Sequence, residues 1–196
     1  TCEGGAVLTN NKTIDDKIKR IRTHGMTKDA SLLQRNDGPW YYEMFELGYN
    51  LRLTDLQCAL GSSQLTKLDN FVIKRQKIAE LYDRLLSGNE YLKIPKSEKE
   101  IGHGYHLYPL NISFEKLELS KKEFFEKMKI AGINLQVHYI PIHLQPFYQQ
   151  KFGYKKGDFP VAETYYNNEV SLPIYPDLSV DDVEYVAKNI LNLISK

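Results

Sequence analysis

The stretch GYNLRLTDLQ, residues 48–57, places two polar side chains, Asn50 and Arg52, between leucines just before a predicted helix. Thr54 and Gln57 have the spacing of a capping box, so the helix should begin directly after Thr54. Asn50 and Arg52 therefore lie on the approach to a helix N-terminus, where unpaired backbone N–H groups favour an anion. The residues alone leave two readings open: an anion site, or a turn whose arginine pairs with a surface carboxylate.

Upstream of this stretch, the sequence predicts a short strand, a helix and a long loop. Residues 4–10, GGAVLTN, are β-prone. The run TIDDKIKRIRTHG has an apolar side of isoleucines, with Thr13 as the expected N-cap and Gly25 as the stop. Residues 26–49 have no periodicity but are rich in aromatic side chains, so we expect a functional or mobile loop there.

Downstream, helix-like and strand-like segments alternate, which predicts a mixed α/β fold with an α+β C-terminal part. From about residue 88 onward this part should have its own core. Helices are expected around residues 66–87, 120–132 and 179–196, and strands at 106–114, interrupted by Pro109, and at 133–141.

Composition argues against several classes of protein. Lys and Arg number 26 and Asp and Glu number 25, without long blocks of one sign, which gives little support for a nucleic-acid or membrane-surface partner. No apolar run has the roughly 20 residues that a spanning helix requires. Only Cys2 and Cys58 occur, so a disulfide scaffold is not indicated and a cytoplasmic location is expected.

The five histidines are His24, His103, His106, His138 and His143. None has a strong metal-ligand spacing, and His103 and His106 fit a solvated turn better than a ligand pair, so no metal is expected. His138 shares the polar face of the 133–141 strand, facing either solvent or a cleft. No nucleophile motif or phosphate-binding glycine loop is present, and no catalytic residue can be assigned.

Four segments, in this order, resemble the C-terminal half of the DegT/DnrJ/StrS family of sugar aminotransferases: EGGAVLTNN, RTHGM, LGYNLRLTDLQCALGSSQL and QVHYIPIH. The resemblance covers essentially the whole chain. It implies the type I (aspartate-aminotransferase) fold of pyridoxal phosphate enzymes, with residues 1–65 as the end of the large, cofactor-binding domain and 66–196 as the small domain. Within the family, HYIPIHLQPFYQQ and SLPIYPDL look most like the branch that makes pseudaminic acid.

The resemblance also implies roles for individual residues. The loop matching GYNLRL would reach the neighbouring subunit of a homodimer, where Asn50 would donate a hydrogen bond to the phosphate of pyridoxal phosphate. Arg52 would supply a fixed charge for that phosphate or for the substrate. Three residues would line the nucleotide-sugar pocket, with ordinary core and surface roles as the alternative: His138, Tyr139 and His143.

The implied reaction moves an amino group from an amino acid, glutamate in most relatives, to the keto group of a nucleotide-linked sugar. In the family, the lysine that binds the cofactor stands a few residues before the EGG motif, which places it upstream of Thr1. We therefore expect a C-terminal piece that is inactive alone and does not retain the cofactor. The alternatives are a complete interaction module or a regulatory relative without catalysis, and the sequence before Thr1 would discriminate among the three.

Overall fold

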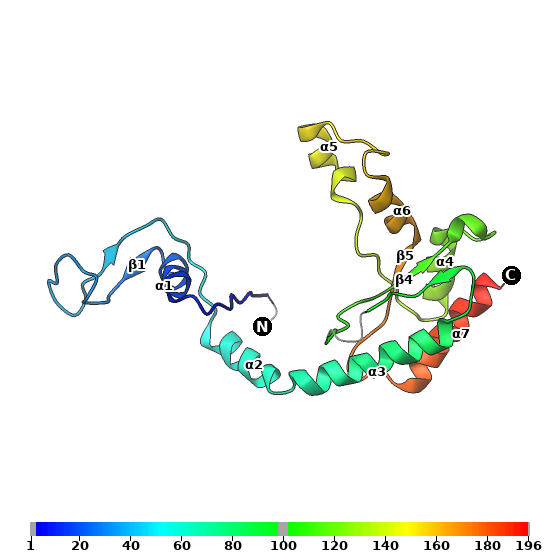
Figure 1. Ribbon diagram of the computed structural model, residues 1–196, viewed down its shortest axis with the longest axis horizontal. Coiled ribbons are helices and arrows are strands. Elements are labelled where there is room, and N and C mark those ends of the chain that lie inside the picture. Colours follow the sequence, from blue (N-terminus) through cyan, green and yellow to red (C-terminus); the bar gives the residue numbers. More distant parts are fainter. Residues whose placement is uncertain (1–2, 98–101, 196) are drawn as a thin grey trace. The chain divides into compact units, whose positions relative to one another are not determined.

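The computed structural model of the chain describes residues 3–97 and 102–195. The chain divides into two compact units, Thr1–Lys67 and Leu68–Lys196, here called unit one and unit two. Both units mix helices and strands, as the sequence predicts (Figure 1). None of the helices within residues 3–97 and 102–195 combines the length and the hydropathy of a transmembrane span.

Unit one consists of two helices and a short antiparallel ladder, in which Met26 pairs with Met44 and Thr27 with Glu43. The expected loop at 26–49 is therefore closed by two residue pairs near its ends. The elements in chain order are α1 (Lys12–Ile21), β1 (Met26–Thr27), β2 (Glu43–Met44) and α2 (Asp55–Leu65).

Two expectations for unit one were wrong in detail. The N-cap of α1 is Asn11 rather than Thr13, because the Asn11 Oδ1 accepts hydrogen bonds from the backbone amides of Thr13 and Ile14 at 2.9 and 3.3 Å. The β-prone run 4–10 is not a strand. A strand needs a partner for its backbone groups, and no segment described in this unit pairs with that run.

Unit two contains a three-stranded antiparallel sheet in the order β3-β4-β5. The three predicted helices are confirmed as α3, α4 and α7, with the predicted Ser120–Glu123 capping box and Ser179 cap both formed. The elements are α3 (Leu68–Leu86), β3 (Leu92–Lys93), β4 (Tyr108–Ile112), η1 (Phe114–Lys116), α4 (Lys121–Ile130), η2 (Ile142–Leu144), α5 (Pro146–Phe152), α6 (Pro160–Asn168), β5 (Glu169–Leu172) and α7 (Val180–Ile194).

The hydrophobic core lies in unit two. Helices α3 and α7 pack against each other, and Figure 1 shows α5 and α6 on the opposite side of the sheet from α3. The alternate residues Tyr108, Leu110 and Ile112 of β4 are fully buried, as are Phe124 and Met128 of α4. Every buried hydrophobic side chain among the described residues lies between Ile78 and Ile194.

Pro109 is compatible with the central strand because its nitrogen lies at a position where neither neighbouring strand requires an N–H donor. It lies opposite Ser171 of β5. Ser171 exchanges both of its backbone hydrogen bonds with Gln136 on its other side, at 2.9 and 3.3 Å, so no N–H is required from Pro109 toward β5. On the far side, β3 pairs only with Asn111 and Ile112. The missing donor therefore leaves no gap in either ladder.

The strand expected at 133–141 is reduced to one bridge, Gln136–Ser171. At the next paired position, the backbone N–H of His138 donates to the carboxylate of Glu169 at 2.9 Å. A side chain thus takes the place of the carbonyl that would continue the ladder. Ile133 and Leu135 are buried as the alternation predicts, but Tyr139, expected on their face, is 73% exposed.

We predict that hydrogen exchange separates the two units. Amides of β4 and α7 should exchange only through global unfolding, whereas those of α2 should exchange much faster, because no side chain of α2 is buried. Exchange followed by mass spectrometry measures this directly. Dilution controls for self-association through the exposed leucines of unit one, and protection of α2 equal to that of α7 in the dilute sample would contradict the prediction.

Candidate functional site

The first group of candidate residues lies where the segment around Asn50 passes the C-terminal end of α1. The amide of Tyr49 donates to the carbonyl of Ile21 at 2.7 Å. Gly25, at φ +69°, would place a Cβ only 1.7 Å from the carbonyl oxygen of Glu46, and a Cβ on Gly48 would lie 2.2 Å from the amide nitrogen of Gly25. This close backbone approach requires both glycines.

This approach brings Asn50 and Arg52 together with His24. The Arg52 Nε donates to the Asn50 Oδ1 at 3.0 Å, and one terminal guanidinium nitrogen lies 3.3 Å from the His24 Nε2. His24 takes the left-handed conformation, at φ +58°, in the turn that ends α1. Sequence reasoning gave His24 no role beside Asn50, because 26 positions separate them. The motifs RTHGM, which contains His24, and GYNLRL, which contains Asn50, were the signals in the sequence that could have connected the two residues.

The chemistry of this group suits an oxygen anion such as a phosphate. Because the Asn50 oxygen accepts from Arg52, the amide nitrogen of Asn50 and the remaining guanidinium N–H groups are the donors that the pair can offer. Both side chains are exposed, and α2 begins nearby at Asp55 with the predicted Thr54–Gln57 capping box in place. Asp55, in the first turn of α2, is a carboxylate that would oppose an anion at the start of this helix.

The second group lies in unit two, where His138 is bound to β5. The His138 Nδ1 lies 2.8 Å from the Ser171 Oγ, and the Ser171 hydroxyl donates to the Glu169 Oε1. Glu169 is fully buried and Ser171 is 4% exposed, whereas His138 is partly exposed. The ring of Tyr139 meets the His138 ring edge-on at 4.5 Å. Sequence reasoning did not identify Glu169 or Ser171, since neither belongs to a recognisable catalytic spacing.

His143 occupies a different environment from His138. It is 6% exposed, its Nε2 lies 2.9 Å from the Glu163 Oε1, and its ring packs on Phe159 at 4.7 Å. Glu163 also accepts from the amide of Gly157 at 2.7 Å. The hydrogen bond from His143, with that from Gly157, lowers the pKa of Glu163 below its usual value. This pair ties the loop after Tyr139 to the start of α6.

An apolar hollow of about 630 Å³ lies beside Tyr139. Its lining residues are Tyr139, Pro141, Asp158, Phe159, Pro160, Val161, Ala162 and Tyr165. Of the expected pocket residues, only Tyr139 lines it. His138 contacts the Tyr139 ring, and the ring of His143 packs against that of Phe159. A hollow walled by aromatic rings and prolines can accept a planar or sugar ring by stacking.

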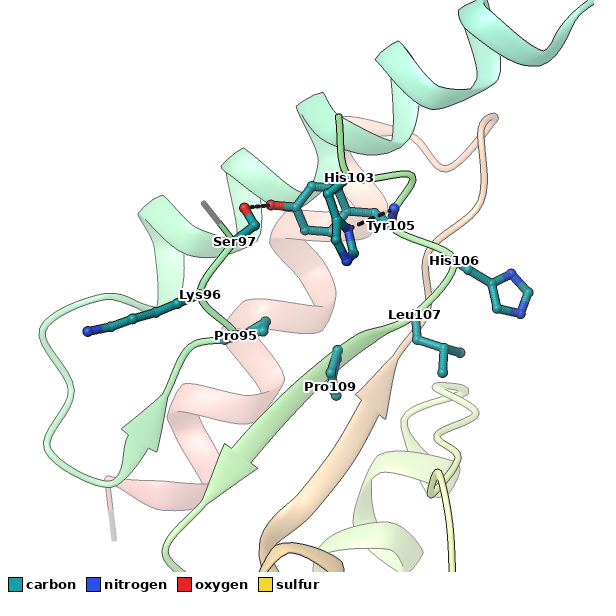
Figure 2. A pocket seen from close by; sticks show the side chains of 8 residues that line it. All are labelled: Pro95, Lys96, Ser97, His103, Tyr105, His106, Leu107 and Pro109. Carbon is teal, nitrogen blue, oxygen red and sulfur yellow. Dashed lines mark hydrogen bonds between the residues drawn. The ribbon is translucent and has the colours of Figure 1, made fainter. Parts of the chain in front are cut away.

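A second hollow, of about 400 Å³, lies at the start of β4 (Figure 2). The Tyr105 hydroxyl and the Ser97 Oγ are 2.8 Å apart, and the His103 Nδ1 accepts from the Tyr105 amide at 3.1 Å. His103 therefore stabilises its own turn. Within residues 3–97 and 102–195, no three His, Cys, Asp or Glu side chains are grouped to hold a metal ion. The lining residues are Pro95, Lys96, Ser97, His103, Tyr105, His106, Leu107 and Pro109.

The lowered pKa of Glu163 predicts a pH-dependent contribution to the stability of unit two. A carboxylate whose pKa is lower in the folded state stabilises the fold above its unfolded pKa of about 4.3, and this contribution is lost as the pH falls through the lowered value. Urea unfolding between about pH 6 and pH 3 should show that Glu163→Gln removes this part of the pH dependence. Glu184→Gln, at an exposed position of α7, is the control for loss of one carboxylate, and equal profiles for the two variants would contradict the prediction.

Comparison with known proteins gives a consistent result. The sequence profile of the DegT/DnrJ/EryC1/StrS aminotransferase family matches residues 1–191. An uncharacterised protein of Methanocaldococcus jannaschii is 43% identical over 196 residues, which are 100% of this chain and 51% of that protein. A UDP-4-amino-4,6-dideoxy-N-acetyl-beta-L-altrosamine transaminase of Campylobacter jejuni is 37% identical over 196 residues, 100% of this chain and 49% of the relative.

Among solved structures, the Helicobacter pylori aminotransferase PseC, involved in the biosynthesis of pseudoaminic acid, superposes with a TM-score of 0.81 at 32% identity. The superposition covers 95% of this chain and 47% of that structure. The chain thus spans about half the length of the curated relatives it matches. These matches confirm the fold class expected from the sequence, half of a type I pyridoxal phosphate transferase fold.

Proposed function

Because this chain belongs to the DegT/DnrJ/EryC1/StrS aminotransferase family, we propose that the protein containing it transfers an amino group from an amino acid to the keto group of a nucleotide-linked sugar. The match over residues 1–191 carries this proposal. The Campylobacter relative is named for a UDP-linked 4-amino-4,6-dideoxy sugar, which supports a UDP-linked 4-keto-6-deoxy sugar as acceptor. Glutamate is the donor that we propose from the family resemblance. We place the enzyme in the cytoplasm, since two cysteines in 196 residues do not indicate a disulfide scaffold.

We assign unit one to the end of the cofactor-binding large domain and unit two to the small domain. Unit one exposes large apolar side chains, which supports this assignment because such side chains often mark a surface that another domain or subunit covers. Examples are Val7, Leu8, Leu56 and Leu65, at 67%, 94%, 81% and 68% exposure. The lysine that carries the cofactor would stand before Thr1, and the chain alone would then be inactive. A homodimer would complete each site with residues of both subunits.

The residues of unit one fit the phosphate of pyridoxal phosphate. When bound, this cofactor supplies an electron sink for the transfer of the amino group. Asn50 would donate an amide N–H to the phosphate, and the guanidinium of Arg52, oriented by its bond to the Asn50 Oδ1, would supply positive charge. His24 would hold the far end of that guanidinium. In unit two, Tyr139 would stack on the nucleotide sugar and His138 would hydrogen-bond to it.

We predict that Asn50→Ala in the full-length protein weakens cofactor retention without unfolding it. Losing one hydrogen bond to a charged phosphate costs about 1.5–3 kcal/mol, which is about ten- to a hundredfold in affinity. Titration of the cofactor-free protein, followed by absorbance, measures the change. Asn134→Ala, at an exposed position of unit two, is the matched control, and equal affinities for the two variants would exclude a phosphate contact by Asn50.

Mixed dimers test whether Asn50 acts on the neighbouring subunit. A subunit with Asn50→Ala is combined with one that lacks the cofactor-bearing lysine. If Asn50 serves the partner's site, one site of each mixed dimer has both defects and the other has neither, so about half of the wild-type activity per dimer returns. At a cofactor concentration that saturates the wild type but not Asn50→Ala, mixed dimers that form but show little activity indicate that Asn50 serves its own subunit.

We also predict that the 196-residue chain alone has no specific cofactor lysine. Borohydride reduction after incubation with pyridoxal phosphate should label several lysines at low occupancy, because the exposed lysines present no distinguishing site. Peptide mapping by mass spectrometry gives the occupancy of each lysine, and glutamate-dependent transamination is assayed in parallel. One stoichiometrically labelled lysine would place the cofactor-bearing residue within this chain.

A further inference from the structure

We infer that Glu169 and Ser171 are positioning residues that hold the proton of His138 on Nδ1, so that Nε2 is the ring atom that accepts a hydrogen bond from the substrate. The identity of that ligand, a nucleotide-linked sugar, rests on the proposed function. The arrangement of the three side chains rests only on the geometry of unit two.

The three residues form a continuous chain of hydrogen bonds. The Glu169 carboxylate accepts from the His138 backbone amide at 2.9 Å through Oε2 and from the Ser171 hydroxyl through Oε1. The Ser171 Oγ lies 2.8 Å from the His138 Nδ1. Glu169 and Ser171 are alternate residues of β5, so their side chains lie on one face of that strand. Both are buried, at 0% and 4% exposure, so water does not compete for these bonds.

Counting protons fixes the direction of each bond. An ionised carboxylate only accepts hydrogen bonds, and a serine hydroxyl has one proton to donate. The Ser171 proton is therefore used on Glu169, and the Ser171 Oγ can only accept from His138. The His138 Nδ1 must then carry a proton, in the neutral ring as well as in the charged one.

This direction depends on ionisation of Glu169, because a protonated carboxyl could donate to Ser171 and reverse the chain. Both of its oxygens accept hydrogen bonds, from the His138 amide and the Ser171 hydroxyl, which is the arrangement that an ionised carboxylate requires. Among the described residues, Lys121 of α4 and Tyr165 of α6 interact electrostatically with Glu169. Burial lowers the pKa of Lys121, and the Glu169 charge counteracts part of this decrease. Burial, with a smaller effect of Glu169, raises the pKa of Tyr165, which keeps its hydroxyl neutral.

The chemistry of the remaining nitrogen defines the group that it binds. A neutral imidazole with its proton on Nδ1 offers Nε2 as an acceptor, so the matching ligand atom is a donor, either a sugar hydroxyl or the imide N–H of a pyrimidine base. His138 does not itself line the apolar hollow, but its ring centroid lies 4.5 Å from that of Tyr139, which does. His143 does not offer the same atom, because its Nε2 is bound to Glu163.

Nitrogen NMR of the histidine-labelled 196-residue chain tests the arrangement without requiring activity. At a pH well above the ordinary histidine pKa of about 6.5, the ¹⁵N shifts distinguish a protonated from an unprotonated ring nitrogen. We expect the His138 Nδ1 to be protonated and Nε2 unprotonated. A proton on Nε2 in the wild type would overturn the inference. The Ser171→Ala spectrum assigns the His138 signal, while His143, bonded to Glu163, is the internal reference and should not change.

Glu169→Gln provides a sharper variant because it should invert the tautomer. The carboxamide oxygen would accept from the His138 amide, its NH₂ would donate to Ser171, and the Ser171 hydroxyl would then donate to Nδ1, which moves the ring proton to Nε2. A proton that stays on Nδ1 in this variant contradicts control by Glu169. If Glu169→Gln does not fold, Ser171→Ala decides, since loss of the hydroxyl should leave both tautomers populated.

Kinetics of the full-length enzyme test the ligand. Ser171→Ala should raise the KM for the nucleotide sugar about two- to tenfold, the effect of one uncharged hydrogen bond, and leave the half-reaction with the amino acid unchanged. Ser171→Thr, which keeps the hydroxyl, should restore the KM. A shifted tautomer with an unchanged sugar KM would refute the ligand contact. A wild-type enzyme without aminotransferase activity would refute the proposed function, while the NMR result would still decide the arrangement.

Discussion

The buried carboxylate of Glu169 is the constraint around which unit two is organised. A carboxylate removed from water is stable only when donors replace the lost solvation. The Ser171 hydroxyl, two positions along β5, is one donor, and the His138 amide of the neighbouring loop is the other. Because the Glu169 carboxylate accepts from the His138 amide, it fixes the backbone of the 136–138 segment along β5 and ends the strand pairing of that segment after Gln136. The partly exposed His138 ring acquires its orientation from a group that is itself fully buried.

The two units are stabilised by different physical means. Unit two has a continuous apolar core between α3, α7 and the sheet, in which each lost side chain would leave a cavity. Unit one has no large buried apolar side chain among its described residues, and its order depends on backbone hydrogen bonds and on the contact that Gly25 and Gly48 permit. A site built by close backbone approach is precise only while that contact persists. A surface that covers the apolar side chains of α2 would therefore also help to hold Asn50 in position.

Local signals in the sequence predicted local structure well. The capping boxes at Thr54 and Ser120 and the Ser179 cap are formed as their spacing indicates, because each depends only on residues three positions apart. The strand at 133–141 was overestimated because its alternation continues past Gln136, whereas its ladder ends at a long-range bond to Glu169. The N-cap of α1 was placed two residues late because Asn11 and Thr13 are both good caps and only the observed bonds choose between them.

Parts of the candidate site could not be predicted because they depend on contacts between residues far apart in the sequence. His24 lies 26 positions before Asn50 and is joined to it only by the tertiary contact with Arg52. Ser171 and Glu169 follow His138 by about thirty positions, and strand residues of these types are ordinarily paired surface groups. Nothing local distinguishes a serine that supports an imidazole from a serine that faces solvent.

The motif HYIPIH shows how five positions can separate two functions of the same residue type. His143 is buried, and its bond to Glu163 fixes the end of the loop to α6, so this histidine is unavailable for chemistry through Nε2. His138 begins the loop, is partly exposed, and has its Nδ1 bound instead. Because one ring is held through Nε2 and the other through Nδ1, the loop between them is fixed at both ends while only the first ring retains an open acceptor. Tyr139 lies between these anchors and is 73% exposed, so its ring is presented by a supported loop to whatever fills the hollow.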